Sequence, residues 1–217
     1  MATRVLIADD HALMREGLRR ILDTDPSFAV AGEAADGHEV LARARAGGFE
    51  VLLLDLSMPG RSGIELLKQV KTERPELRVL VLSMHDAQQY AVRAIRAGAS
   101  GYLTKDAAAT QLIDALKRIA AGSIFITPDV AEALALQLQA PTEDLPHKRL
   151  TDREYEVLLL LAEGASITDI AKRLHLSVKT VSTHKTRILE KMNAESLADL
   201  VRYALTHRLI DSPDLPR

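Results

Sequence analysis

The sequence predicts an α/β fold in which a doubly wound, five-stranded parallel sheet carries helices on both faces and a second, smaller all-α domain follows. Three observations lead to this prediction. Apolar runs alternate with segments of helical periodicity from residue 3 to residue 121, a pattern typical of parallel sheets. The central run, Val51 to Leu54, lacks polar alternation, as expected of a strand buried on both faces. From Leu150 onward the periodicity is helical throughout.

The composition agrees with a folded two-domain protein. The chain has 217 residues, and one domain usually takes roughly 100–200. Hydrophobic residues make up 47% of the chain and charged residues 27%, which excludes a disordered protein. The lack of cysteine excludes disulfides and thiolate metal sites. The sequence shows no secretory signal and no bilayer-spanning apolar run, so we expect a cytoplasmic protein that does not act at a membrane.

Each element of the first domain has its own signal. The expected strands are short apolar runs at residues 5–8, 28–30, 51–54, 79–82 and 102–103. A helix follows each strand: the first ends at Asp25-Pro26, the second at Gly47-Gly48, the third before Pro75, the fourth covers about 87–97 with Gly98 as its C-cap, and the fifth covers about 107–121 before Gly122. Met58-Pro59-Gly60 is expected to be a loop.

Polar residues stand at the ends of four of these strands. They are Asp9-Asp10, Asp55, Ser83 and Thr104-Lys105. The carboxyl ends of parallel strands face the crevice in which open α/β sheets bind ligands, so we expect these side chains to share one site. A single residue of this kind is more often a cap or a solvated side chain, but recurrence at four strand ends favours a site.

The residue types in this group indicate phosphoryl chemistry. Neighbouring carboxylates repel one another unless a cation lies among them, and Mg²⁺ is the hard, oxygen-binding ion that suits them. The expected ligands are Asp9, Asp10, Asp55 and a backbone carbonyl near Ser57. Lys105 supplies a positive charge and Ser83 a hydroxyl donor. Together they would stabilise a phosphoryl group in transfer, with Asp55 as the nucleophile that accepts it.

The remaining chain divides into a linker and a helical domain. We expect domains at residues 1–122 and 148–217, with a linker at 123–147 that includes a short helix opened by Thr127-Pro128 and a stretch rich in proline and acid at 140–146. In the second domain, Thr151 to Glu154 form a capping box ahead of a first helix that ends at Gly164. Ser166 and Ser177 cap the second and third helices, which a turn at His175 to Ser177 separates.

The third helix, which runs to about Met192, has one apolar and one polar face. Val178, Val181, Ile188 and Met192 recur on the side expected to pack, with His184 and Lys185 at its margin. A short capped helix, a turn and a helix with outward polar residues form a helix-turn-helix, whose second helix enters the DNA major groove. We expect Ser182, Thr183 and Thr186 to reach bases, and Lys179, Lys185 and Arg187 to reach phosphates. A helical bundle with a solvated basic face is the alternative that periodicity alone leaves open.

The charge distribution favours the DNA-binding interpretation. The formal net charge is only −2, yet Lys172 to Lys191 hold six basic residues against the single acid Glu190. A local basic excess of this kind is what a surface facing nucleic acid requires. A fourth helix carries an apolar stripe formed by Leu197, Leu200, Val201, Ala204 and Leu205. Such a stripe usually closes the core of its own domain.

The first 122 residues resemble the receiver domain of bacterial two-component response regulators. The resemblance rests on Asp9-Asp10, Asp55 followed by Met58-Pro59-Gly60, Ser83, and Tyr102 ahead of Thr104-Lys105. It implies a flavodoxin-like sheet of strand order 2-1-3-4-5, phosphorylation of Asp55 by a sensor histidine kinase, and Mg²⁺ held by Asp9, Asp10, Asp55 and the Ser57 carbonyl. It further implies that Lys105 pairs with the phosphoryl group and that Ser83 and Tyr102 move as a switch.

The second domain resembles the LuxR-type DNA-binding domain, and the whole chain resembles the NarL/FixJ subfamily of transcriptional response regulators. The matching residues are Leu150 to Glu154, Val157-Leu158, Gly164, Ile170-Ala171, Leu176-Ser177, Thr180-Val181 and His184. The resemblance adds Thr180 to the expected DNA contacts. It implies double-stranded promoter DNA and RNA polymerase as partners, and a homodimer formed through Leu197, Val201 and Leu205. Ser166-Ile167-Thr168-Asp169 departs from the family's usual Ser-Asn-Lys-Glu and lacks its lysine.

Two other functions use the same residues. A phosphatase could employ Asp55 as its nucleophile, but such enzymes commonly carry a second Asp two residues later as general acid, where this chain has Ser57. We therefore expect no enzymatic turnover beyond the protein's own phosphoryl transfer and dephosphorylation. A receiver that ignores phosphate and serves only as a dimerisation platform is the other alternative, which the intact acidic set disfavours.

Overall fold

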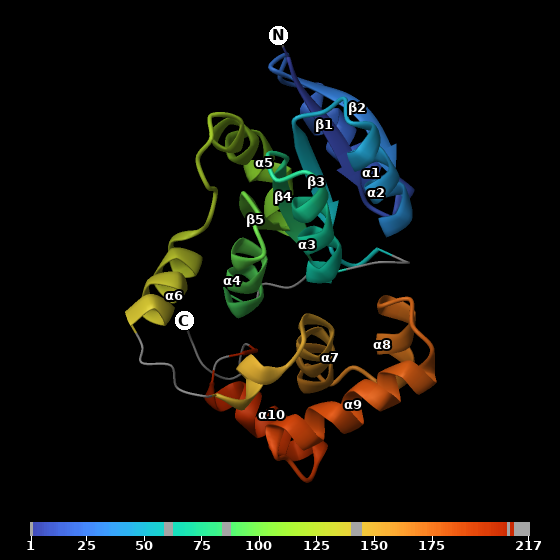
Figure 1. Ribbon diagram of the computed structural model, residues 1–217, viewed down its shortest axis with the longest axis vertical. Helices are drawn as coiled ribbons and strands as arrows, with labels where there is room; N and C mark the ends of the chain where they lie inside the picture. Colours follow the sequence, from blue (N-terminus) through green and yellow to red (C-terminus); the bar gives the residue numbers. More distant parts are fainter. Residues whose placement is uncertain (1, 59–62, 84–87, 140–144, 208, 211–217) are drawn as a thin grey trace. The chain divides into compact units, whose positions relative to one another are not determined.

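A five-stranded parallel sheet forms the centre of the first half of the chain (Figure 1). Its strands are β1 (Thr3–Ala8), β2 (Phe28–Ala34), β3 (Val51–Asp55), β4 (Arg78–Ser83) and β5 (Gly101–Thr104). Their order in the sheet is β2-β1-β3-β4-β5, which confirms the predicted order. β3 lies in the middle with all five of its residues buried, as its unbroken apolar run predicts.

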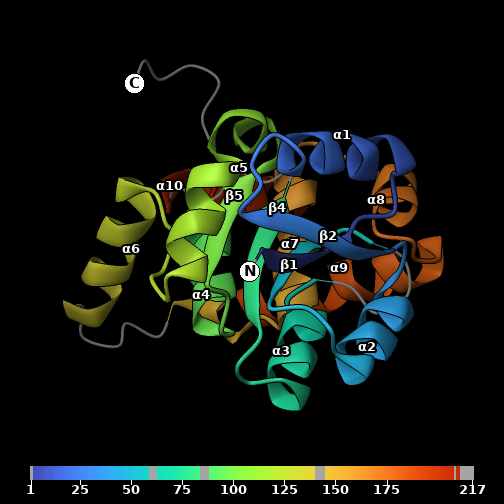
Figure 2. The same cartoon turned by 90° about the horizontal axis from the view of Figure 1, so that it is seen from above.

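Helices cover both faces of this sheet. They are α1 (Ala12–Leu22), α2 (Gly37–Ala46), α3 (Gly63–Glu73), α4 (Gln88–Arg96) and α5 (Lys105–Ala120). Figure 2 shows α1 and α5 on one side of the sheet and α2 and α3 on the other. On the α1 and α5 side, alternate strand residues such as Ile7, Leu53 and Leu82 pack against Leu18 and Leu116. This core is mostly aliphatic, with Phe28 and Phe125 among its members, in keeping with the 3% aromatic content.

The structure is a computed structural model that describes residues 2–58, 63–83, 88–139, 145–207 and 209–210. The chain forms two compact units, one mostly within residues 1–134 and the other mostly within 135–217. Pro59 and Gly60 of the expected loop, Ala87 of the expected fourth helix, and residues 140–144 of the expected linker lie outside the described residues.

Among the element boundaries that differ from the sequence prediction, those of β2 and α5 have clear local causes. β2 continues four residues beyond Val30, to Ala34; it is an edge strand, so polar Glu33 can stand within it and apolar periodicity underestimates its length. α5 begins at Lys105 instead of about Ala107, because the Thr104 hydroxyl accepts a hydrogen bond from the Ala107 N–H and caps the helix two residues earlier.

Predicted helix ends are confirmed where glycine takes a backbone conformation that other residues rarely adopt. Gly98 ends α4 with φ of 100°, and Gly164 follows α7 with φ of 89°. The third helix of the second unit uses Asn193 in the left-handed conformation for the same purpose, a cap that the sequence analysis did not identify.

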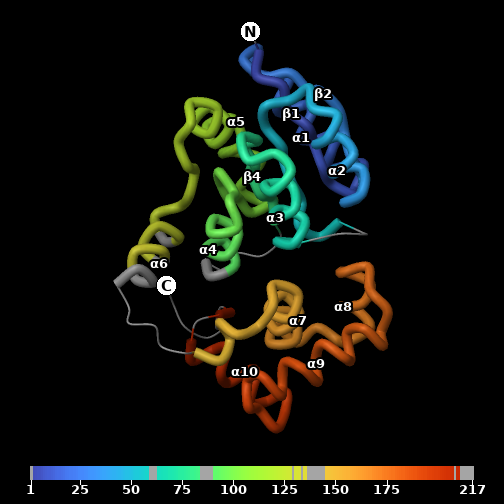
Figure 3. The backbone as a smooth tube through the Cα atoms, in the orientation of Figure 1, coloured from blue at the N-terminus to red at the C-terminus, as the bar shows by residue number. Residues whose placement is uncertain are grey.

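The second unit is helical, and Figure 3 follows its chain from α7 to α10. Its elements are the short 3₁₀ helix η1 (Pro146–Arg149), α7 (Asp152–Ala162), α8 (Ile167–Arg173), α9 (Val178–Met192) and α10 (Leu197–Thr206), and α6 (Pro128–Gln139) precedes them. α7 is the central helix: α8, α9 and α10 all contact it, and its residues Glu154 to Ala162 are buried. The predicted capping box is present, with Thr151 and Glu154 exchanging hydrogen bonds.

Among the described helices, none combines the length and the apolar character that crossing a bilayer requires.

Candidate functional site

The parallel register brings the polar strand ends together. Ala8 lies beside Leu54, Asp55 beside Leu82, and Ser83 beside Thr104. The residues that follow β1, β3, β4 and β5 therefore reach the same edge of the sheet, as predicted from the four polar strand ends. Asp9, Asp55 and Ser83 are all fully buried there.

Asp55 is held by a contact on each carboxylate oxygen. The Lys105 ammonium nitrogen lies 2.8 Å from Oδ2, and the Ser57 backbone N–H donates to Oδ1 at 2.9 Å. Burial raises the pKa of Asp55 above its ordinary value, outweighing the lowering effect of Lys105. The carboxylate is thus fixed in orientation and poorly solvated.

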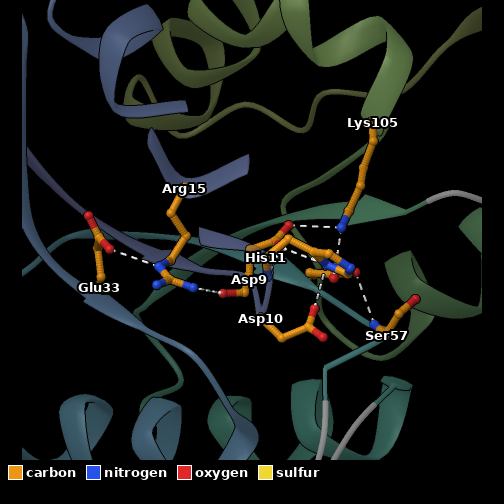
Figure 4. A network of polar contacts seen from close by, with 8 residues as sticks. Asp9, Asp10, His11, Arg15, Glu33, Ser57 and Lys105 are labelled. Carbon is orange, nitrogen blue, oxygen red and sulfur yellow. Dashed lines mark hydrogen bonds and ion pairs between the residues drawn. The ribbon is translucent and has the colours of Figure 1, made fainter. Parts of the chain in front are cut away.

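Lys105 joins two carboxylates. Its nitrogen lies 2.8 Å from an oxygen of Asp55 and 2.8 Å from an oxygen of Asp9, and its side chain is only 6% exposed. Burial by itself would lower the pKa of Lys105, but the two carboxylates raise it by more, so the pKa is raised and the amine stays charged. Figure 4 shows Lys105 reaching into the acidic cluster from α5.

The acidic cluster includes a residue that the sequence analysis missed. One ligand atom from each of Asp9, Asp10, His11 and Asp55 lies within 4.8 Å of the others. His11 Nδ1 is 2.9 Å from Asp10 Oδ1 and 3.4 Å from Asp9 Oδ1. A sequence signal exists, because histidine is a common metal ligand and His11 directly follows the acidic pair; the expected ligand set contained only oxygen atoms.

A second layer of contacts holds the loop that carries these acids. Arg15 of α1 donates to the Asp9 backbone carbonyl at 2.8 Å and to Glu33 of β2, also at 2.8 Å (Figure 4). Arg19 also donates to Glu33, and the hydrogen bonds from Arg19 and Arg15 lower the pKa of Glu33. Sequence reasoning could not find this group, because only the fold brings β2 beside α1.

The charges at the site fit a divalent cation. Lys105 pairs with Asp9 and Asp55, and Asp10 adds a third carboxylate to the cluster. A divalent ion would offset charge among these acids, and carboxylate oxygens are the ligands that Mg²⁺ prefers. The donor set therefore fits the predicted ion.

The other predicted receiver residues also lie at this edge. Ser83 is fully buried at the end of β4, and Tyr102 of β5 is buried with 5% of its surface exposed. Tyr102 pairs with Val81 in the sheet register, two residues before Ser83. The two candidates for a switch thus stand on adjacent strands, Ser83 on β4 beside the Asp55 strand and Tyr102 on β5 one strand further out.

In the second unit, α8 and α9 form the predicted helix-turn-helix. The Ser166 hydroxyl accepts from the Asp169 N–H at 3.1 Å, and the Ser177 hydroxyl accepts from the Thr180 N–H at 3.0 Å. The turn contains His175 in the left-handed conformation, with φ of 52°. Both predicted N-caps are confirmed, so each helix starts where the sequence analysis placed it.

The outward face of α9 carries the predicted polar residues. Lys179, Thr183, Thr186 and Arg187 are exposed, and Thr180, Ser182 and Lys185 are half-buried. The hydroxyls of Ser182, Thr183 and Thr186 each donate to the backbone carbonyl four residues earlier, at 2.9–3.2 Å. Each hydroxyl proton is used in a hydrogen bond within the helix. The side chains therefore expose oxygen lone pairs and, in the threonines, a methyl group.

The packing face of α9 corrects one prediction. Val181, Ile188 and Met192 are buried, but Val178 is 49% exposed. It occupies the first turn of the helix, where the core of this small unit does not extend. His184 is half-buried, burial lowers its pKa, and its Nδ1 contacts no hydrogen-bond partner among the described residues, so it belongs to the packed margin of the helix.

The stripe on α10 divides into two sides. Leu200 and Ala204 are fully buried against the unit's own core. Leu197 and Leu205 are 36% and 38% exposed, and with Val201 they line an open apolar groove. Half of the stripe therefore closes the core, and the other half remains at the surface.

Fold and site together define a receiver domain joined to a helix-turn-helix domain. Comparison with known families agrees: residues 5–117 match the response regulator receiver domain, and residues 148–204 match the luxR family of bacterial regulatory proteins. The chain belongs to the NarL/FixJ family of two-component response regulators, and it is a phosphorylation-dependent transcription regulator.

Relatives match along almost the whole chain. The response regulator UvrY of Escherichia coli K12 is 32% identical over 97% of this chain and 97% of its own length. The oxygen regulatory protein NreC of Staphylococcus carnosus is 37% identical over 96% of this chain and 99% of its own length. Among solved structures, Salmonella typhimurium RcsB is 32% identical with a TM-score of 0.68, covering 97% of this chain and 100% of its own. A complex of RcsB with DNA is 33% identical with a TM-score of 0.59, covering 94% and 98%.

Proposed function

We propose that Asp55 accepts a phosphoryl group from a sensor histidine kinase and that this event controls binding to promoter DNA. One observation carries the proposal: a fully buried carboxylate at the end of the central strand is in contact with Lys105 and clustered with two further acids. In the transfer, an Asp55 oxygen attacks phosphorus, the P–N bond to the kinase histidine breaks, and the imidazole leaves with the electron pair.

The neighbouring groups have separate roles in this reaction. Asp9, Asp10, Asp55 and the Ser57 carbonyl would hold Mg²⁺, which neutralises charge on the phosphoryl oxygens. Lys105 gives up its ion pair with the Asp55 carboxylate and binds the phosphoryl group instead. The Ser83 hydroxyl then donates a hydrogen bond to a phosphoryl oxygen. Tyr102 moves together with Ser83, which gives the receiver two states.

DNA binding is assigned to α9. Lys179, Lys185 and Arg187 contact phosphates, and Thr180, Ser182, Thr183 and Thr186 approach the groove. Exposure of Lys179, Thr183, Thr186 and Arg187 supports this assignment. The related RcsB has been solved in complex with DNA, which also supports promoter binding here, with RNA polymerase as a further partner in the cytoplasm.

We further propose a homodimer through α10. Leu197, Val201 and Leu205 line a surface groove of apolar character, and a two-fold pair of recognition helices matches two DNA half-sites. The functional domains are then residues 1–122 and 148–217, with 123–147 as the linker between them. Phosphorylation changes the receiver state, and the linked helical domains pair on DNA.

The test is a random-oligonucleotide binding selection with the wild-type protein and the Asp55→Asn variant, each with and without a small-molecule phosphodonor and Mg²⁺. We expect an enriched two-fold motif whose affinity increases with phosphodonor only in the wild type. Labelling that persists in Asp55→Asn would overturn the choice of acceptor. Unchanged DNA affinity would favour the dimerisation platform, and steady turnover of a generic phosphate ester would favour the phosphatase.

A further inference from the structure

His11 stands at the acidic cluster with its ring directed at two of the acids. Its Nδ1 is 2.9 Å from Asp10 Oδ1 and 3.4 Å from Asp9 Oδ1, and its ligand atom lies within 4.8 Å of those of Asp9, Asp10 and Asp55. Figure 4 shows the ring among these side chains. The imidazole nitrogen therefore belongs to the same small group of candidate ligands.

The position of His11 in the helix does not explain this orientation. His11 is the N-cap residue of α1, but its side chain makes no capping hydrogen bond. Its backbone N–H donates to Asp9 Oδ1 at 2.9 Å, which fixes the residue beside the cluster through the main chain. The ring, 71% exposed, was free to point into solvent. Instead, Nδ1 contacts the carboxylates of Asp9 and Asp10.

We propose that the His11 imidazole nitrogen is a ligand of the divalent ion at this site. As a result, the site prefers a first-row transition ion such as Mn²⁺ over Mg²⁺ more strongly than a site made of carboxylates alone. This inference rests on the proposed metal-binding function of Asp9, Asp10 and Asp55. Mg²⁺ favours oxygen ligands, whereas imidazole is a good ligand for transition ions. A site with oxygen ligands and one nitrogen ligand therefore favours transition ions, relative to Mg²⁺, more than a site with oxygen ligands alone.

The available atoms are sufficient for such a site. Asp9 and Asp55 each direct Oδ2 at Lys105. Their Oδ1 atoms each accept one backbone N–H, from His11 and Ser57, and keep a second lone pair that can bind the ion together with Asp10 and His11. Binding replaces the contact between His11 and Asp10 with a contact from each of them to the ion. The ring is exposed, so this requires no repacking of the core.

Electron spin echo spectroscopy of bound Mn²⁺ provides the direct test. A directly coordinated imidazole nitrogen produces ¹⁴N modulation, which carboxylates and water do not. We expect the modulation in the wild-type full-length protein and its loss in His11→Gln. His38→Gln is the matched control, because His38 is an exposed histidine of α2 in the same unit, and it should retain the signal.

Metal titration provides the second measurement. Loss of groups outside the first ligand sphere already changes metal affinity by roughly 10- to 100-fold, so His11→Gln should weaken Mn²⁺ binding by at least about tenfold while Mg²⁺ binding changes far less. Equal loss for both ions, or wild-type Mn²⁺ without ¹⁴N modulation, would overturn the proposal. Circular dichroism verifies that the variant is folded.

The two proposals fail in different ways. If wild-type protein is labelled on Asp55 by a phosphodonor with Mg²⁺ but bound Mn²⁺ shows no ¹⁴N modulation, only the role of His11 is wrong. If neither ion binds the wild-type protein and Asp55 is not labelled, the metal-dependent phosphoryl transfer is wrong, and the inference about His11 fails with it.

Discussion

At Asp55, the features that suit catalysis also lower the stability of the folded protein. The side chain is fully buried, and its pKa is raised above 3.8 chiefly by that burial. A carboxyl group whose folded pKa is raised binds its proton more tightly in the folded state than in the unfolded chain. Ionisation of Asp55 therefore reduces the free energy of unfolding, and the loss is complete once pH exceeds the raised value.

The raised pKa of Asp55 leads to the first prediction. Without divalent ions at pH 7, Asp55→Asn should have a higher free energy of unfolding than wild type, by about 0.5–2 kcal/mol, the usual gain from a stabilising substitution, because the buried charge is removed and Asp9 still pairs with Lys105. The higher free energy of unfolding of the variant should appear as pH rises above 3.8, and the two proteins should be equally stable below that pH. Urea unfolding across this pH range, in a chelator, gives the measurement. A variant less stable than wild type at pH 7 would contradict it.

Mg²⁺ should reverse the difference. An ion that binds only the folded state stabilises it by about 2.7 kcal/mol at 100 times its Kd. Wild type retains the full set of acids, so saturating Mg²⁺ should raise its free energy of unfolding by more than that of Asp55→Asn. The same urea titration at pH 7 with added Mg²⁺ measures the difference. An equal increase in both proteins would place the ion elsewhere.

On α9, Thr183 should affect DNA recognition without affecting folding. Its side chain is exposed and bonds only its own helix backbone, so Thr183→Ala should change stability by less than about 0.5 kcal/mol. Loss of a base contact should cost about 1–3 kcal/mol of discrimination. Fluorescence anisotropy with single-base operator variants measures both affinity and preference.

Thr72→Ala is the matched control for that experiment. Thr72 is also exposed and donates to the carbonyl four residues earlier, at 2.8 Å, but it lies on α3 of the receiver unit. The operator preference of the Thr72→Ala protein should equal that of wild type. If Thr183→Ala matches Thr72→Ala in both affinity and preference, Thr183 does not read a base.

At the scale of elements, the start of α7 is tied to α9 by one carboxylate. Glu154 accepts the Thr151 N–H at 2.8 Å and the Lys191 ammonium at 2.6 Å. Burial raises the pKa of Glu154, but these contacts lower it by more, so it is below its ordinary value of 4.5. Stability from this group is present above that value and is lost as pH falls through the lowered one.

We therefore predict that Glu154→Gln lowers the free energy of unfolding at pH 7 by about 1.5–3 kcal/mol, the usual contribution of a hydrogen bond to a charged group. The difference from wild type should shrink as pH falls below 4.5, because wild-type Glu154 then takes up a proton. Glu190→Gln on the exposed face of α9 should show no such effect. A pH-independent loss in Glu154→Gln would mean that its charge is not responsible.

The two sides of α10 give a paired prediction. Leu200→Ala removes a fully buried side chain and should cost about 2–5 kcal/mol of stability. Leu197→Ala changes a side chain that is 36% exposed, so it should leave folding nearly unchanged but weaken dimerisation. Urea unfolding and sedimentation of both variants separate the effects. A Leu197→Ala dimer as tight as wild type would exclude this groove as the interface.

At the scale of the whole molecule, each unit has its own core. The sheet core lies under α1 and α5, and α7 forms the centre of the helical unit. The proposed chemistry at Asp55 and the proposed DNA contacts on α9 thus belong to separate cores. Coupling between them has to pass through the linker or through contacts that change with the receiver state.

Separate expression of residues 1–128 and 146–217 tests this division. We expect two proteins that each unfold in a single cooperative transition. In the full-length chain, Asp55→Asn should shift the unfolding of the first domain and leave that of the second unchanged, because distant independent sites do not couple. The isolated second domain should bind DNA without regard to phosphodonor. Failure of either piece to fold would show that the domains depend on each other.

The sequence by itself determined the parallel sheet and the edge at which its polar strand ends meet, and its resemblance to receiver domains predicted the strand order. Buried parallel strands need unbroken apolar runs, so β3 is readable from Val51 to Leu54, and polar residues at strand ends must meet at one edge. Capping is equally local. The helix starts predicted from Thr151, Ser166 and Ser177 are confirmed, because a cap acts on a backbone N–H only three residues away.

Only the tertiary structure decided which neighbours those residues meet. Periodicity assigned Val178 to the packing side, but the core ends before the first turn of α9 and leaves it exposed. The support of Asp9 by Arg15 and Glu33, and the ring of His11 beside Asp10, depend on distances between separate elements. Spacing along the chain fixes the direction of a side chain, whereas packing of distant segments decides what lies in that direction.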